Sequence, residues 1–237
     1  MRIQRALAQA GVAGRRAAER MVAEGRVAVN GVPARVGQSV GPTDTITVDG
    51  AAVEAQERRT LLLNKPRGVL SSVGDARGRP TVVDNLPDLG RLYPVGRLDL
   101  QTTGAILITN DGELAHRLMH PRYGVTKTYQ VLFAGKLSSA TLRQLRDGVD
   151  LEDGPTAPAG VKRMDRRAGE GTWLELELHE GRNRQIRRMG EAVGHPVVRL
   201  HRSRYAGIGL RNLPPGSWRE LHDHELREIA EKVGLER

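Results

Sequence analysis

Asp99 is the residue of this sequence whose setting most suggests chemistry. It lies between two leucines, two residues after Arg97, in the stretch PVGRLDLQTTGAILITND. A Thr-Thr-Gly turn follows, and then the apolar run 105–108, which is typical of a buried strand. A carboxylate at the mouth of a buried strand is costly to desolvate unless something compensates its charge. Asp99 therefore either caps the local backbone or takes part in a reaction.

A cluster of arginines offers both a partner for this acid and a binding surface for phosphate. Seven arginines lie between Arg182 and Arg204, with Glu191 as the single acid. A carboxylate can act alone as a nucleophile on a sugar or on an electron-poor base carbon, and a nearby cation keeps it ionised. The cluster could supply that cation by folding back. Because acids that would pair along a helix are nearly missing from it, we also expect contact with phosphate.

Composition narrows the classes of function. The 237 residues carry a formal net charge of +9, with a pI of about 10.5, and contain no cysteine. A basic balance favours a polyanionic partner, most often nucleic acid. Disulfides and thiolate metal sites are excluded. The N-terminus lacks the apolar core of a signal peptide, and no apolar run approaches the ~18 residues that span a bilayer. We therefore expect a cytoplasmic protein that is not bound to a membrane.

Metal and nucleotide cofactors are not expected. His116 and His120 are four residues apart on a predicted helix, but Arg117 occupies the position where a zinc protease carries glutamate. A satisfied or surface histidine pair is the better interpretation. AGKLSS resembles a phosphate loop only faintly, and no dinucleotide glycine pattern follows a strand.

The N-terminal region, residues 1–50, is predicted to form a small unit of its own. Two helices are indicated at 3–10 and 15–24, each followed by a glycine that can end it. RVAVNGVPARV predicts a hairpin around Asn30-Gly31, and DTITVDG predicts another short strand. Residues 51–60 are polar and weakly patterned, and we interpret them as a linker.

Residues 61–237 are predicted to form a larger α+β domain. Strands are expected in TLLLNKPRGVLSS, KTYQVLFAG and TWLELELHEG, of which the last two alternate between apolar and polar residues. Helices are expected in the segment after Asp111, stopped at His120-Pro121, and in TLRQLRDGV, NRQIRRMGEAV and HDHELREIAEKV.

Several motifs together resemble the RsuA/RluB group of bacterial ribosomal pseudouridine synthases. VGRLDLQTTGAILITND resembles the catalytic motif of this group, and LLLNKPRGVLSS resembles its first motif. KTYQV resembles its tyrosine strand, EGRNRQIRRMGEAVGHPVVRLHRSRYAGIGL resembles its third motif, and residues 1–50 resemble its S4 RNA-binding domain. The fold implied is an S4-like domain followed by a catalytic domain with a mixed, mostly antiparallel sheet.

The resemblance implies roles for individual residues. Asp99 matches the catalytic aspartate, Tyr129 the tyrosine that packs on the target base, and Arg187 the arginine that pairs with the aspartate. Arg97 matches the arginine near the flipped nucleotide, and Lys65 and Lys127 match motif positions in support of the site. The residues expected to bind RNA are Arg15, Arg16, Arg26, Arg182, Arg184 and Arg188.

The activity implied is isomerisation of a uridine to pseudouridine in ribosomal RNA, without a cofactor, by a monomer acting on rRNA or on a ribosome assembly intermediate. LEDGPTAP, EGRNRQIRRM and RSRYAGIGL are most similar to the RluB branch, which favours 23S rRNA over the 16S rRNA of the RsuA branch. Asp99 could attack the base, attack the sugar or abstract a 2′ proton. Two other classes stay open: a non-catalytic rRNA-binding or assembly protein, and a hydrolase of N-glycosidic bonds.

Overall fold

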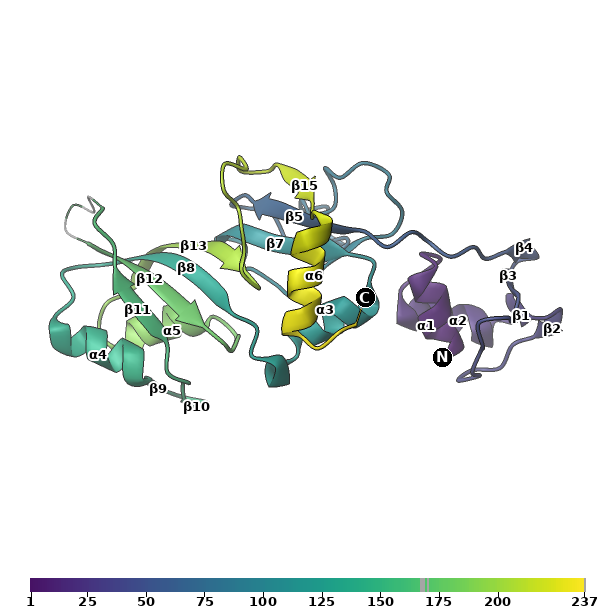
Figure 1. Cartoon of the computed structure of the whole chain (residues 1–237), viewed down its shortest axis with the longest axis horizontal. Coiled ribbons are helices and arrows are strands. Elements are labelled where there is room, and N and C mark those ends of the chain that lie inside the picture. Colours follow the sequence, from purple (N-terminus) through teal and green to yellow (C-terminus); the bar gives the residue numbers. More distant parts are fainter. Residues whose placement is uncertain (167–168, 170, 237) are drawn as a thin grey trace. The chain divides into compact units, whose positions relative to one another are not determined.

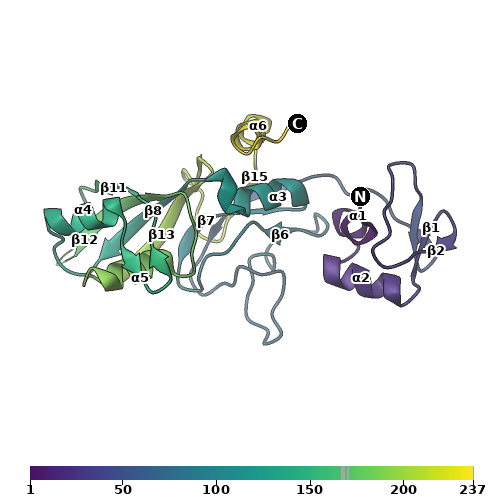
Figure 2. The ribbon, with the colours of Figure 1, turned by 90° about the horizontal axis from the view of Figure 1, so that it is seen from below.

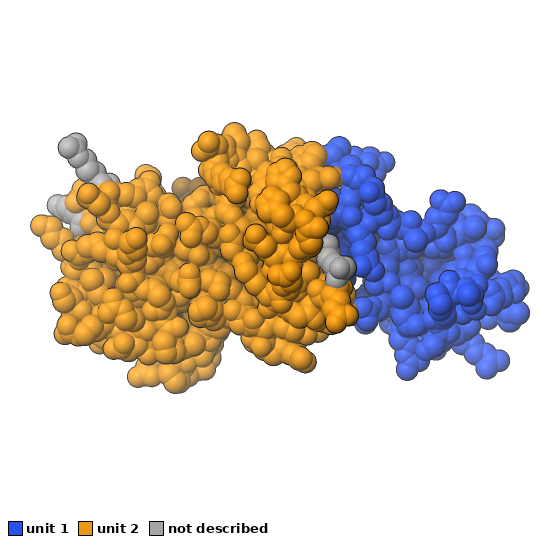
Figure 3. Space-filling model, in the orientation of Figure 1, with its two compact units in different colours: residues 1–59, 87–93, 109–112 blue, residues 60–86, 94–108, 113–237 orange. Residues whose placement is uncertain are grey.

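The computed structural model describes residues 1–166, 169 and 171–236, which divide into two compact units. The first unit contains Met1–Arg59 with Pro87–Tyr93 and Thr109–Gly112, and the second contains the remainder (Figure 3). Each unit has a hydrophobic core of its own. In the part of the chain that the structure describes, no helix is long and apolar enough to cross a membrane.

The first unit packs two helices against a small sheet with strand order β2-β1-β3-β4. Its elements are α1 (Ile3–Gln9), α2 (Arg15–Ala23), β1 (Val27–Val29), β2 (Val32–Pro33), β3 (Ile46–Val48) and β4 (Ala51–Ala52). Asn30 and Gly31 both have positive φ between β1 and β2, as the predicted hairpin requires. Because β4 pairs with β3, the sheet extends past residue 50 into the segment interpreted as a linker, so the first two residues of that segment belong to the sheet.

The second unit is built on a nine-stranded sheet whose main path runs β11-β12-β8-β13-β7-β5-β15 (Figure 1). β8 pairs antiparallel with β12 and β13, and β15 with β5, whereas β13 and β7 run parallel. The mixed, mostly antiparallel sheet expected for this domain is therefore present. The strands are β5 (Thr60–Lys65), β6 (Tyr93–Pro94), β7 (Thr103–Thr109), β8 (Lys127–Phe133), β11 (Gly160–Arg163), β12 (Thr172–Leu178), β13 (Val197–Tyr205), β14 (Ile208–Gly209) and β15 (Trp218–Glu220).

Two helices cover one face of this sheet and create the main core. α4 (Ser139–Asp147) contributes Leu145, and α5 (Gln185–Ala192) contributes Ile186 and Met189. These side chains pack with alternate residues of β8 and β12, because every second side chain of a strand points to the same face: Val131, Phe133, Leu174, Leu176 and Leu178. Figure 2 shows α4 and α5 beside these strands. A two-stranded hairpin of β9 (Asp150–Leu151) and β10 (Gly154–Pro155) follows α4.

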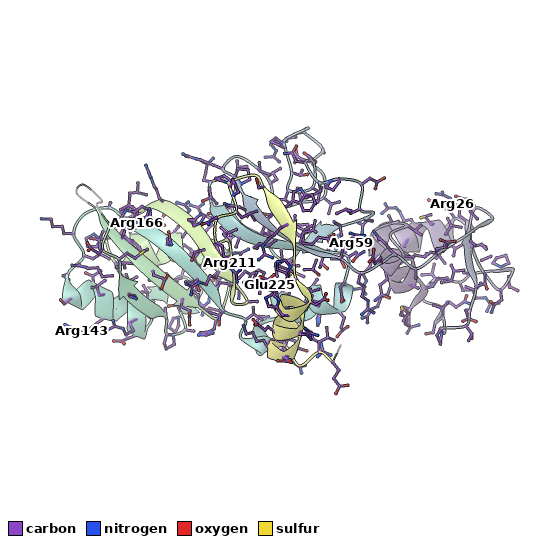
Figure 4. All side chains as sticks on the ribbon, turned by 45° about the horizontal axis from the view of Figure 1, so that its top comes forward. Arg26, Arg59, Arg143, Arg166, Arg211 and Glu225 are labelled. Carbon is purple, nitrogen blue, oxygen red and sulfur yellow. The ribbon has the colours of Figure 1, made fainter. Side chains whose placement is uncertain are left out.

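The other two helices lie near β5 and β7. α3 (Gly112–Met119) stops before His120-Pro121, as predicted, and Pro121–Tyr123 forms a single 3-10 turn. α6 (Asp223–Lys232) starts at a capping box between His222 and Glu225. Arg219 of β15 donates to both carboxylate oxygens of Glu225, at 2.6 and 2.7 Å, and Figure 4 shows Glu225 at this end of the helix. The pair joins the edge strand to the helix.

The parallel contact between β7 and β13 fixes the start of β7, immediately after Asp99. Gly104 pairs with Arg202 across this contact and has φ +112°. A Cβ at Gly104 would lie 2.2 Å from the backbone oxygen of Arg202, so the close approach requires glycine. Arg202 Nε donates to Ala105 O at 2.6 Å, and Thr103 Oγ1 is 2.9 Å from His201 Nδ1. Thr103 and Gly104, which were expected to form part of a turn, are therefore the first residues of β7 and are held by the strand beside them.

Candidate active site

Asp99 lies in the loop between β6 and β7, and the backbone of this loop is fixed on both sides of it. Thr102 N donates to Asp99 O at 3.0 Å. On the preceding residue, Ser71 Oγ donates to Leu98 O and accepts from Leu98 N, both at 3.0 Å. The Asp99 side chain is 32% exposed and has no hydrogen bond in the described part of the chain. The carboxylate is thus held in place through its backbone and does not cap the loop.

Two guanidinium groups of the third motif stand beside the Asp99 carboxylate. Arg184 Nη1 is 3.9 Å from Asp99 Oδ2, and Arg187 Nε is 4.0 Å from the same oxygen. The arginine segment therefore folds back on Asp99, as the sequence suggested. Arg187 was expected to do so, whereas Arg184 was expected only to bind RNA.

Arg187 is the more firmly held of the two arginines. Its side chain is 15% exposed, and Nη1 donates to Val197 O at 3.3 Å. Its Nε is buried and has no hydrogen-bond partner among the described residues. A buried N–H without a partner is unfavourable, and catalytic contacts are often long in a free enzyme and tighten on substrate binding. The Nε of Arg187 is placed for such a contact with Asp99.

An open cavity adjoins Asp99 on the helical face of the sheet. Its walls include Tyr129 of β8, Leu178 of β12 and Leu200 of β13, together with Arg97 and Thr102 from the Asp99 loop. Tyr129 thus lines the same cavity as the carboxylate, and an aromatic ring beside a polar group suits a flat base. Thr102 is buried, and its hydroxyl has no hydrogen-bond partner in the described ranges. The sequence analysis did not single out Thr102.

Lys65 lies at the end of β5 and is fully buried. Its ammonium donates to Pro66 O at 2.9 Å. Burial lowers the pKa of Lys65 from 10.5 to about 8, and the negative charge of Asp99 opposes that shift. Lys65 is therefore a third cation that interacts electrostatically with Asp99.

Lys127, by contrast, does not reach the cavity. Its ammonium donates to Val125 O at 2.8 Å. Burial and the nearby charge of Arg202 lower its pKa to about 8, while Glu180 opposes the shift. Arg202 is itself buried in the β7–β13 contact. Lys127 and Arg202 therefore stabilise β8 and β13, to which they belong, and neither of them lines the cavity.

Two arginines expected to bind RNA are already engaged by acids. Arg188 donates to both carboxylate oxygens of Asp153, at 2.8 and 3.1 Å. Arg182 Nε donates to Glu180 at 3.3 Å, and its other nitrogens donate to the carbonyls of Gly154 and Pro155. The sequence analysis looked for partner acids within the cluster, but these come from the β9–β10 turn and from the end of β12. Arg182 and Arg188 therefore stabilise the conformation of the third motif. The sequence did not indicate this structural role.

The comparisons with known proteins agree with this geometry. Residues 59–192 match the family described as RNA pseudouridylate synthase, and residues 1–46 match the S4 domain. The chain belongs to the RNA pseudouridylate synthase family. The S4-like fold expected for the N-terminal region is likewise confirmed.

Relatives of this synthase extend over nearly the whole chain. It is 47% identical to "Ribosomal large subunit pseudouridine synthase B" of Bacillus subtilis over 234 residues, which covers 96% of this chain and 95% of that protein. It is 44% identical to an uncharacterized RNA pseudouridine synthase of Aquifex aeolicus, with 99% and 96% covered. A crystal structure of a pseudouridylate synthase superposes with a TM-score of 0.69 at 28% identity, over 97% of this chain and 99% of that one.

The S4 domain of the synthase presents its expected RNA-binding arginines unequally. Arg15 and Arg16 are exposed at the start of α2. Arg26 is half-exposed, but its Nη2 lies 2.6 Å from Asp49 Oδ2, and Nη1 lies 3.6 Å from Glu24. Arg15 and Arg16 are therefore better placed than Arg26 to reach a phosphate.

The depressed pKa of Lys65 makes the stability of the catalytic unit depend on pH. Below pH 8, folded and unfolded chains both carry the proton on Lys65. Between pH 8 and 10.5 the unfolded chain keeps a proton that the folded chain has lost, so the free energy of unfolding rises with pH. We expect the wild type to gain about 1–3 kcal/mol over this window relative to Lys65→Met, which cannot titrate.

Denaturant unfolding at a series of pH values measures this difference. Both tryptophans, Trp173 and Trp218, belong to the second unit, so their fluorescence reports on the catalytic unit alone. Lys127 titrates in the same range in both proteins and cancels from the comparison. Unfolding free energies that run parallel from pH 7 to 10.5 would contradict the burial of the Lys65 ammonium.

Proposed function

We propose that this chain isomerises one uridine of large-subunit 23S ribosomal RNA to pseudouridine, with Asp99 as the catalytic residue. The observation that carries the proposal is the Asp99 carboxylate, flanked by two guanidinium groups in a cavity that Tyr129 also lines. The choice of 23S rRNA is supported by relatives named ribosomal large subunit pseudouridine synthase B. We propose further that the enzyme acts in the cytoplasm as a monomer, on rRNA or on an assembly intermediate.

The reaction is a rearrangement within one nucleotide. The N1–C1′ bond breaks, the uracil turns, and C5 bonds to C1′; C5 then loses its proton, and N1 carries one in the product. The composition of the nucleotide is unchanged overall, because C5 releases one proton to water and N1 gains one, and no electron passes to a second molecule. The target uridine must first leave its stack, which costs a few kcal/mol, and contacts with phosphate and with the base offset that cost.

Each residue of the cavity has its own role in this reaction. Asp99 faces the reacting carbons, and Arg187 and Lys65 supply positive charge beside it. Tyr129 stacks on the uracil after it leaves the helix. The Thr102 hydroxyl, which has no partner in the described chain, is available for a polar edge of the base or for the ribose.

Mapping of pseudouridine tests this function directly. Unmodified 23S and 16S rRNA, each as free RNA and within ribosomal particles, are incubated with the enzyme and sequenced after chemical marking of pseudouridine. We expect one modified position, in 23S rRNA. Modification of 16S rRNA alone would contradict the proposed target, and absence of pseudouridine from all four substrates would contradict the proposed activity.

The same reactions discriminate the two other classes of function. A hydrolase of N-glycosidic bonds releases free uracil and leaves an abasic site, whereas a synthase releases none. A non-catalytic binding protein retains rRNA but leaves its uridines unchanged. Chromatography of the soluble products, together with RNA retention on a filter, distinguishes both from the expected result.

A further inference from the structure

Arg184 has a backbone conformation that its side chain type does not favour. Its φ and ψ are 49° and 30°, in the left-handed region, at the residue that precedes α5. Asn30, Asp49, Ala206 and Arg211 also have positive φ. Asn and Asp tolerate this region because their short side chains can hydrogen-bond locally. Arginine has no such compensation. An unfavourable conformation of this kind persists where the surrounding structure imposes it, often at a binding site.

The strained backbone aims the Arg184 guanidinium at Asp99. Nη1 lies 3.9 Å from Asp99 Oδ2, which is an ion pair without a hydrogen bond, and the Arg184 side chain is 51% exposed. Such exposed and loose pairs contribute little stability. Within the described chain, Asp99 is the one partner found for this guanidinium.

Arg187 stays beside Asp99 whether or not Arg184 does. It approaches the same oxygen at 4.0 Å, is far less exposed, and is anchored to Val197 O. If Arg184 moves away, Arg187 remains next to Asp99, and Lys65 still interacts with it electrostatically. The two guanidinium groups therefore differ in kind: Arg187 is fixed in the protein, and Arg184 is free to change partners.

Arg184 is also one of the few cations at the cavity that can take a phosphate. Arg182 lines the same cavity, but Glu180 and two carbonyl groups occupy it. Arg188 is held by Asp153 in a two-pronged pair. A target nucleotide brings its phosphate to the rim when its base enters between Asp99 and Tyr129. An exposed arginine at that rim suits phosphate, because its planar fork can donate two hydrogen bonds to it.

We propose that Arg184 is a substrate-positioning residue that exchanges partners: it pairs with Asp99 in the free enzyme and with a phosphate adjoining the target uridine in the complex. The exchange removes one of two cations from Asp99 Oδ2 at the moment when the base arrives, and thereby frees that oxygen for the reaction. The inference rests on the proposed function, since it assumes a flipped uridine in this cavity.

Arg184→Met tests the exchange, because methionine keeps the strained backbone and removes the charge. We expect KM for the RNA to rise at least tenfold, with kcat within threefold of the wild type. Arg187→Met, in contrast, should lower kcat at least 100-fold. A kcat for Arg184→Met that falls as far as that of Arg187→Met would overturn the proposal, because Arg184 would then be a permanent partner of Asp99.

Substrates with one uncharged phosphate locate the contact. A methylphosphonate is placed on the 5′ side or on the 3′ side of the target uridine. At one of these positions we expect the wild type to lose at least tenfold in kcat/KM and Arg184→Met to lose less than twofold further. If each methylphosphonate lowers kcat/KM of Arg184→Met as much as it lowers that of the wild type, the proposed phosphate contact is wrong. Arg184→Lys should recover part of the lost affinity, since lysine also binds phosphate as a point charge.

Arg143→Met is the matched control for loss of one positive charge. Arg143 is an exposed arginine of α4, lies outside the arginine cluster and does not line the cavity. We expect its KM to stay within threefold of the wild type; a rise equal to that of Arg184→Met would reduce the effect to net charge. Wild-type turnover tests the proposed function by itself. RNA affinity, measured for all variants by filter retention, tests this inference even if turnover is absent, and equal affinities would overturn it.

Discussion

Asp99→Asn should slow pseudouridine formation by at least about 10³-fold, which corresponds to about 4 kcal/mol in the barrier. Asparagine has nearly the same shape but lacks the charge that the two arginines and Lys65 are arranged around. Among the described residues, no other carboxylate is placed to substitute, because Glu180, the second acid that lines this cavity, is engaged with Arg182 and Gln185. Tritium released from C5-labelled uridine in the target rRNA measures the rate.

The matched control for this substitution is Asp153→Asn. Asp153 also pairs with two arginines, Arg182 and Arg188, but it does not line the cavity. We expect its turnover to stay within about tenfold of the wild type, and RNA affinity of Asp99→Asn to be nearly unchanged. If Asp99→Asn keeps more than a tenth of the wild-type rate, a loss under about 1.4 kcal/mol, Asp99 is not the catalytic residue.

Gly104→Ala should destabilise the catalytic unit by about 3 kcal/mol or more, or prevent it from folding. The added methyl group meets the Arg202 backbone, with the oxygen 2.2 Å and the nitrogen 2.7 Å away. β7 and β13 cannot move apart easily, because Arg202 Nε also donates a hydrogen bond to Ala105 O. Steric overlap with backbone adds to the penalty for an L-residue at φ +112°. Denaturant unfolding followed by tryptophan fluorescence gives the loss.

Gly154→Ala separates the two parts of this penalty. Gly154 has φ +98°, but a Cβ there meets no atom within 4 Å. We expect it to cost about 1–2 kcal/mol, the cost of the backbone conformation alone. Equal losses for Gly104→Ala and Gly154→Ala would show that β7 and β13 adjust to the methyl group, and that their contact is not as tight as described.

Local patterns in the sequence predicted most elements because their signals lie within a few residues. The Asn30-Gly31 hairpin, the stop of α3 at His120-Pro121 and the alternating strand β12 all follow from short-range rules. β13 was missed, because arginine occupies a buried position of the strand (Arg202) as well as exposed ones (Arg199 and Arg204) and drew attention to charge. The alternation is also interrupted: Leu200 and Arg202 are buried, but a register shift between Arg202 and Arg204 moves the next buried position to Tyr205.

The sequence singled out Asp99, beside which the structure places two arginines, but it indicated few of the contacts around it. Asp99 was identified because an acid at the mouth of an apolar strand is costly, which one segment alone reveals. The role of Arg188 depends on Asp153, which is 35 residues away, and Arg182 donates to the carbonyls of Gly154 and Pro155 in the same hairpin. The burial of Lys65 likewise depends on the whole sheet around β5. Pairings of this kind follow from the tertiary fold, and no local pattern records them.

The place of β5 in the sheet sets an order of events for a chain that is still being synthesised. All six residues of β5 are buried, and one of its neighbours is β15; Asn64 Nδ2 donates to Leu213 O, a residue 149 positions later. Contacts this distant in sequence form late, and chains dominated by them fold slowly. The last strand of the S4 sheet ends at Ala52, and its strands pair with one another within a short stretch of the sequence. A nascent chain can therefore hold a folded RNA-binding domain while its catalytic sheet still waits for the last strand to leave the ribosome.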